Sequence, residues 1–96
     1  MILHILTQAP DSSAAIQMQQ AVGEHDAVLL IEEAVTAVLN PSWAAWQHCS
    51  SRIFLLSEDL VSRGLAGVAI KNKLPTLEVE GFVALTEQYE KAVTWY

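Results

Sequence analysis

The chain has 96 residues, of which 52% are hydrophobic and 17% are charged, and its 11 acidic and five basic residues give a net charge of -6. This length predicts one domain over residues 1–96 with a small core. The negative balance argues against direct binding of nucleic acid, because such binding needs Lys and Arg to neutralise phosphates. Since the apolar share is large for so small a core, we expect some of it to face another subunit.

The N-terminus and the single cysteine bear on the cellular compartment. Met1–Leu6 lacks the basic start of a signal peptide, and no apolar run reaches the roughly 18 residues of a membrane span. Cys49 is the only cysteine, so an internal disulfide is excluded, and no Cys/His spacing resembles a zinc site. We therefore expect a cytoplasmic protein that needs no membrane, metal or other cofactor.

Three short apolar runs predict buried strands at residues 2–6, 27–31 and 53–56. Runs without polar alternation are typical of parallel strands that are covered on both faces. The segments between them have helical spacing, and such alternation predicts βαβ units with right-handed crossovers.

The first two crossovers are expected to be helical. Pro10–Ser13 is a helix-start signal, and Gly23 is placed to end that helix. In the second crossover, residues 35–39 predict a turn or two of helix, and Trp43 and Trp46 fall on one helical face.

The second half of the chain predicts a short helix, a loop, a strand and a final helix. Ser57 is a candidate N-cap and Gly64 a helix end. Residues 66–74 are expected to form a loop, 76–79 an alternating edge strand, and 82–93 a helix with Phe82, Leu85 and Tyr89 along one stripe. The fold class is therefore α/β, a small flavodoxin-like layered fold with a mostly parallel four-stranded sheet flanked by helices.

Acidic residues follow the second and third predicted strands. Open α/β sheets bind ligands at the carboxyl ends of their strands, which directs attention to Ser57, Glu58 and Asp59. Glu32 and Glu33 end the neighbouring strand, and with Asp59 they are candidates for a divalent ion. Helix capping, the helix dipole and a solvated strand end explain the same residues more simply.

Residues 7–13 follow the first strand and open a helix, where hydroxyls and amides can cradle a phosphate. The segment has no glycine to let the backbone close around an anion, and Asp11 would repel it. Phosphate binding is therefore a minor hypothesis.

Cys49 is the one candidate nucleophile. His48 and Arg52 are cations or potential cations close to it in sequence, and a cation lowers a thiol pKa. Cys49 is expected at a helix end, however, where the dipole disfavours a thiolate, so an inert, partly buried thiol is favoured. His4 is expected to be a hydrogen-bonded core imidazole, and His25 an exposed turn residue.

Four segments together resemble the TusB/DsrH family of the DsrE/DsrF-like sulfur-relay superfamily. They are "MILHILTQAP", "DAVLLIEEAVTAVL", "IFLLSEDLVSRGL" and "GFVALTEQYEKAVTWY", and they occur in the family's order. The resemblance covers most of the chain and is weakest at residues 40–51 and 66–79.

The resemblance implies a flavodoxin-like subunit that assembles with TusC-like and TusD-like paralogues into a heterohexamer, a dimer of heterotrimers. In the Tus branch, the complex passes persulfide sulfur from a cysteine desulfurase and a small carrier to a TusE-like protein, for 2-thiolation of the tRNA wobble uridine. In the Dsr branch, related subunits serve sulfur oxidation.

One departure from the family pattern limits what the resemblance implies. DsrH-type members have a cysteine in the first helix, whereas "SSAAIQMQQAV" has none, and Cys49 lies outside that motif. The closer likeness is to the TusB type, which implies a non-catalytic assembly subunit. Three alternatives stay open: a persulfide carrier that uses Cys49, a DsrH-like subunit in sulfur oxidation, and a receiver-like or nucleotide-binding module.

Overall fold

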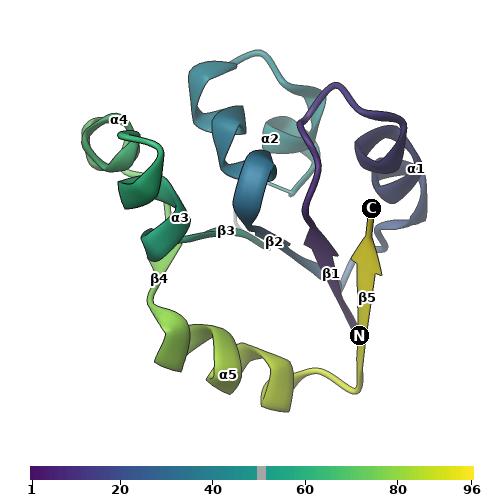
Figure 1. Ribbon diagram of the computed structural model, residues 1–96. Coiled ribbons are helices and arrows are strands. Elements are labelled where there is room, and N and C mark those ends of the chain that lie inside the picture. The colour runs from purple at the N-terminus through teal and green to yellow at the C-terminus, as the bar shows by residue number, and fades with distance from the viewer. Residues whose placement is uncertain (50–51) are drawn as a thin grey trace.

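The computed structural model describes residues 1–49 and 52–96 and contains one five-stranded parallel sheet (Figure 1). Its strands are β1 (Ile2–Leu6), β2 (Ala27–Leu30), β3 (Ile53–Leu56), β4 (Thr76–Leu77) and β5 (Lys91–Trp95). They lie in the order β4-β3-β2-β1-β5, and every neighbouring pair is parallel. The predicted α/β class is confirmed.

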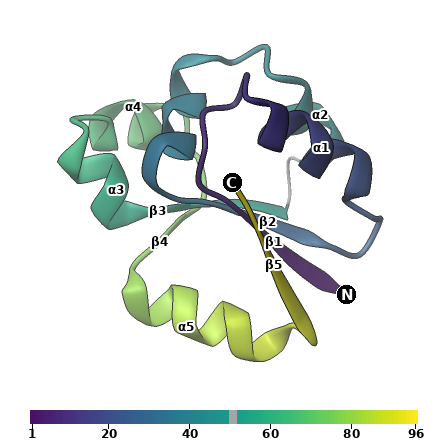
Figure 2. The ribbon, with the colours of Figure 1, turned by 45° about the vertical axis from the view of Figure 1, so that its right-hand side comes forward.

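The helices divide unequally between the two faces of the sheet. Figures 1 and 2 show α5 alone on one face and the other helices on the opposite face. The helices are α1 (Ser13–Ala21), the 3-10 helix η1 (Glu32–Leu39), α2 (Ala44–Cys49), α3 (Ser57–Ser62), α4 (Ala66–Lys71) and α5 (Val79–Gln88). No helix among the described residues is long and apolar enough to span a bilayer.

Strand alternation separates two apolar cores. Leu6, Val28 and Leu30 point to the face that carries most of the helices, where they form the larger core with Met18 of α1. Residues of opposite parity along the strands form a smaller core under α5, with Leu85 as the buried helix residue. Phe82 and Tyr89 pack against this smaller core, so the predicted stripe is confirmed.

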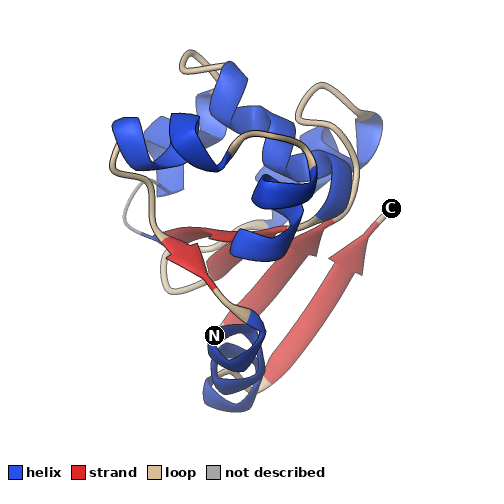
Figure 3. Ribbon diagram, turned by 60° about the vertical axis from the view of Figure 1, so that its left-hand side comes forward, coloured by secondary structure: helices blue, strands red, loops and turns tan. Residues whose placement is uncertain are grey.

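The C-terminal segment differs from the prediction. The predicted helix over 82–93 is wrong at its end, since α5 stops at Gln88 and β5 follows at Lys91–Trp95. Strand β5 pairs with β1, which makes β1 an interior strand and gives the sheet five strands where four were expected. Figure 3 shows β5 at the free edge of the sheet.

Three other local predictions need correction. Residues 66–71 form α4, so the predicted loop over 66–74 is wrong in its first part. Strand β4 keeps its predicted edge position but covers only Thr76–Leu77, because α5 begins at Val79. Ser57 is not an N-cap, because β3 leads directly into α3 and Leu56, which makes no side-chain cap bond, occupies that position.

Two predicted helix boundaries are confirmed. Ser12 caps α1, since its Oγ accepts a hydrogen bond from the Ala15 amide at 3.2 Å. Gly64 follows α3 with φ of +70°, a left-handed conformation that glycine adopts without steric cost.

Candidate functional site

Among the acidic residues at the strand ends, Asp59 has a clear structural role. Asp59, in the first turn of α3, accepts a hydrogen bond through Oδ2 from the Glu32 amide at 2.6 Å. Glu32 adopts a φ of +52°, which is uncommon for a residue with a side chain, and the Asp59 bond helps to hold it there. Asp59 therefore ties the end of β2 to the start of α3.

The hypothesis of a divalent-ion site gains no support from this geometry. Glu32 and Glu33 are both exposed, and Asp59 directs Oδ2 to a backbone amide. Across residues 1–49 and 52–96, no three His, Cys, Asp or Glu side chains lie close enough together to hold a metal ion.

The hydroxyls of the loop after β1 bond to the protein's own backbone. Thr7 Oγ1 donates to the Trp95 carbonyl at 3.1 Å. Ser12 Oγ donates to the Ala9 carbonyl at 2.6 Å while it caps α1. The groups that would cradle a phosphate thus fix the loop and the C-terminal strand.

Cys49 ends α2, as expected, and is 5% exposed. Burial raises the pKa of its thiol and outweighs the opposing effect of the Arg52 charge. A helix end and an apolar setting both disfavour the thiolate, so at neutral pH the group is a thiol, the less nucleophilic form.

Arg52 and His48 do not form a thiol-activating pair. The Arg52 guanidinium donates through Nη1 to the carbonyl oxygens of Gly23 and Asp26, at 2.7 Å and 2.5 Å. It therefore fastens the turn between α1 and β2 to the start of β3. His48 is exposed. Cys49, His48 and Arg52 line a shallow cavity of about 300 Å³. Its other lining residues are Gln19, Gln20, Val22, Gly23 and Glu24.

His4 is a hydrogen-bonded core imidazole, as the sequence indicated, and its partners form a buried polar chain. Its Nε2 lies 2.9 Å from Oδ2 of Asp26, which directly precedes β2. The Asp26 carboxylate also accepts hydrogen bonds from the amides of Ile2, at 2.9 Å, and Gly23, at 2.8 Å. Burial alone would raise the pKa of Asp26, but these hydrogen bonds prevail and lower it from 3.8 to about 2.

Trp95 of β5 completes the chain. Its Nε1 donates to Nδ1 of His4 at 3.1 Å, and the two rings stack with centroids 6.1 Å apart. Because Nδ1 accepts, Nε2 is the nitrogen that carries the proton donated to Asp26. His4 is 2% exposed and both of its ring nitrogens are engaged, so it is unavailable as a general base.

Asp26 and Trp95 were not predicted as partners of His4. The signal for Trp95 is the alternation of side chains along a strand. Once β5 pairs with β1, residues 91, 93 and 95 share a sheet face with residues 2, 4 and 6. That signal was hidden because residues 91–93 were assigned to a helix. His25 is exposed, as predicted.

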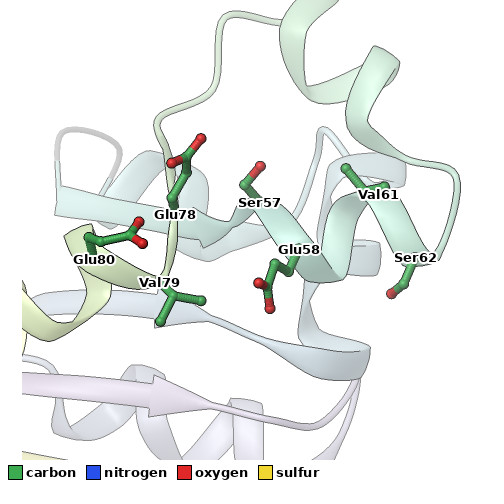
Figure 4. A pocket seen from close by; sticks show the side chains of 7 residues that line it. All are labelled: Ser57, Glu58, Val61, Ser62, Glu78, Val79 and Glu80. Atoms are coloured by element: carbon green, nitrogen blue, oxygen red, sulfur yellow. The ribbon is translucent and has the colours of Figure 1, made fainter.

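A second cavity, of about 410 Å³, lies between α3 and the start of α5. Figure 4 shows Glu58 and Val61 reaching it from α3, and Glu78, Val79 and Glu80 from the segment that begins α5. Glu58 was a predicted site residue, whereas Glu78 and Glu80 were not. Glu78 fell within the strand expected over 76–79, and Glu80 fell between that strand and the helix expected from residue 82.

Together these features define an α/β fold in which most candidate polar residues stabilise the chain itself. The buried Cys49 thiol is un-ionised, and both ring nitrogens of His4 are hydrogen-bonded. The Asp59 carboxylate accepts a hydrogen bond from the Glu32 backbone amide.

Comparison with known proteins agrees with this class. The family model described as "DsrH like protein" matches residues 9–92, and the chain therefore belongs to the DsrH-like family. Proteins named "Protein TusB" from Escherichia coli O81 (strain ED1a) and from Escherichia coli O6:K15:H31 (strain 536 / UPEC) are each 28% identical over 96 residues. The same holds for "Protein TusB" from Shigella boydii serotype 18. Each alignment covers 98% of this chain and 100% of the relative.

Proposed function

We propose that the chain is a non-catalytic assembly subunit of a TusBCD-like sulfur-relay complex that acts in 2-thiolation of the tRNA wobble uridine. The observation that carries this proposal is the alignment with proteins named TusB, which extends over 98% of the chain. End-to-end similarity supports a shared role for the whole chain, as a single domain over residues 1–96.

The proposed partners are TusC-like and TusD-like paralogues in a cytoplasmic heterohexamer, with a TusE-like protein as the indirect acceptor of sulfur. Direct contact with tRNA is not part of the proposal, since a chain with five basic and 11 acidic residues is poorly suited to bind phosphates. A sulfur-relay subunit that assembles the complex needs contact surfaces more than a reactive group.

The properties of Cys49 favour the assembly role over that of a persulfide carrier. A carrier thiol has to meet a partner's persulfide as a thiolate, but Cys49 is 5% exposed and burial raises its pKa. A DsrH-like role in sulfur oxidation is also less favoured, because α1 (Ser13–Ala21) has no cysteine.

The test is to purify the protein with its TusC-like and TusD-like paralogues under native conditions, without reductant. We expect a complex of three kinds of subunit, with persulfide mass on a partner cysteine and none on Cys49. Cys49→Ala should leave the rate of sulfur transfer to the TusE-like acceptor within about twofold of the parent, a change equivalent to less than about 0.5 kcal/mol.

Two outcomes would contradict the proposal. Failure to assemble with the paralogues would reject the subunit role. Persulfide on Cys49, together with loss of transfer in Cys49→Ala but not in Ala45→Ser, a one-atom change at another buried position of the same helix, would assign the chain as a carrier.

A further inference from the structure

The cavity between α3 and α5 combines three carboxylates with exposed aliphatic side chains; we call it the acidic cavity. Its lining residues are Ser57, Glu58, Val61, Ser62, Glu78, Val79 and Glu80 (Figure 4). All three glutamates are exposed, and no lining residue is a cation. Within the described ranges, no Lys, Arg or His side chain lies within ion-pair distance of these three carboxylates, so they are unpaired in the isolated chain.

The aliphatic part of the surface extends beyond the acidic cavity. Val61 is 65% exposed and Val79 is 40% exposed. Val83 lies one helical turn after Val79 on α5 and is 51% exposed. Burial of these side chains against another apolar surface would be favourable, at about 25 cal/mol for each Å² removed from water.

The chemistry of the acidic cavity restricts what can occupy it. Three carboxylates repel phosphates and nucleic acid. No three acidic side chains of the described residues converge as metal ligands, which disfavours a bound divalent ion. A Lys or Arg side chain with aliphatic neighbours fits this surface. Its charged head would pair with the carboxylates, while its apolar stem and the neighbouring aliphatic side chains would pack against the valines.

We propose that the acidic cavity is the surface on which one of the paralogous subunits docks, through a Lys or Arg flanked by aliphatic side chains. This inference rests on the proposed function and assigns its contact surface. The complementary charges accelerate encounter and fix the register of docking, while burial of Val61, Val79 and Val83 slows dissociation.

The test compares two triple variants that remove equal charge. In Glu58→Gln/Glu78→Gln/Glu80→Gln, the acidic cavity loses its carboxylates but keeps its shape. The control, Asp11→Asn/Glu24→Gln/Glu90→Gln, removes three exposed carboxylates that lie outside α3 and α5 and do not line it. Each protein is titrated with co-purified TusC-like and TusD-like subunits at low and high salt, and its melting temperature is checked first.

We expect the acidic-cavity variant to bind about tenfold more weakly than the parent at low salt, and to lose most of the parent's salt dependence. The control should bind within about twofold of the parent. In the parent complex, hydrogen exchange should slow in residues 57–62 and 78–83. Val61→Ser should weaken binding without changing its salt dependence, because it alters only the aliphatic part.

The outcomes separate this inference from the proposed function. If the parent does not bind the paralogues, both are rejected. If the parent binds them but the acidic-cavity variant binds equally well, with the same salt dependence, the docking surface is wrong and the subunit role stands. Self-association of the parent alone that the variant abolishes would assign the acidic cavity to a second copy and overturn the inference.

Discussion

The two edges of the sheet are built differently. At the β5 edge, half-buried Trp95 donates a hydrogen bond to buried His4, which in turn bonds to buried Asp26. At the β4 edge, a two-residue strand is followed by Glu78 and Glu80, which form the acidic cavity with Glu58 of α3 and with exposed valines. The first arrangement satisfies polar groups within the chain, whereas the second leaves charge and apolar area exposed. Substitutions should therefore affect stability at one edge and association at the other.

Asp26→Ala should have the largest effect on stability. It removes the acceptor of His4 Nε2 and of the amides of Ile2 and Gly23, leaving buried donors without partners. We expect a loss of about 3 kcal/mol in the free energy of unfolding, measured with urea. Glu24→Ala, at an exposed carboxylate in the same turn, should change it by less than about 0.5 kcal/mol. Equal losses in the two variants would remove the distinction between the buried chain and ordinary surface charge.

The pH dependence of stability should report the same carboxylate. The pKa of Asp26 is lowered from 3.8 to about 2 on folding, so its stabilisation is complete above pH 3.8 and is lost as the pH falls towards 2. The contribution corresponds to about 2 kcal/mol. Because other carboxylates titrate in the same range, the measurement is the difference in unfolding free energy between the parent and Asp26→Asn, from about pH 5 to pH 2. A difference that stays constant over this range would contradict the assignment.

Trp95→Phe should have a smaller effect that is confined to the β5 edge. The substitution keeps an aromatic ring but removes the donor to His4 Nδ1, and should cost about 1 kcal/mol. Amide hydrogen exchange within Lys91–Trp95 should accelerate more than in β3. Tyr96→Phe is the matched control, since Tyr96 is 83% exposed. Equal acceleration in both variants would show that the hydrogen bond to His4 does not hold β5 in place.

The smallest effect on stability is expected at the β4 edge. The triple glutamine variant of the acidic cavity relieves repulsion but removes Glu58 and Glu80 from the first turns of α3 and α5, where the helix dipole favours them. These terms oppose each other, so the unfolding free energy should stay within about 0.5 kcal/mol of the parent. A larger loss in thermal or urea unfolding would mean that these glutamates support the fold of the isolated chain.

The sequence predicted the features that depend on neighbouring residues. The three apolar runs specified β1, β2 and β3, and the cap at Ser12 and the left-handed Gly64 followed from local chemistry. Strand β5 was missed because the helical stripe of Phe82, Leu85 and Tyr89 continues in phase to Val93. Five alternating residues are a weak signal against a longer helical period.

The candidate site was predicted only in part, because its contacts join distant positions. Burial of Cys49 and hydrogen bonding of His4 followed from residue type and expected location. The identity of their neighbours depends on strand order and register. Once β5 pairs with β1 so that Val93 lies opposite His4, Trp95 falls on the same sheet face as His4, two residues further along. The role of Asp59 likewise needed the left-handed conformation of Glu32, which residue type does not predict.

The position of β5 also affects how the chain folds. His4 and Trp95 are 91 positions apart, so the earliest and latest strands to be synthesised lie side by side in the finished sheet. Until β5 emerges from the ribosome, β1 has an unpaired outer edge, and open strand edges recruit other chains. Closing so long a loop is entropically costly, and topologies rich in distant contacts fold slowly. Slow formation of the β1–β5 pair therefore prolongs the time in which the open edge of β1 can mispair.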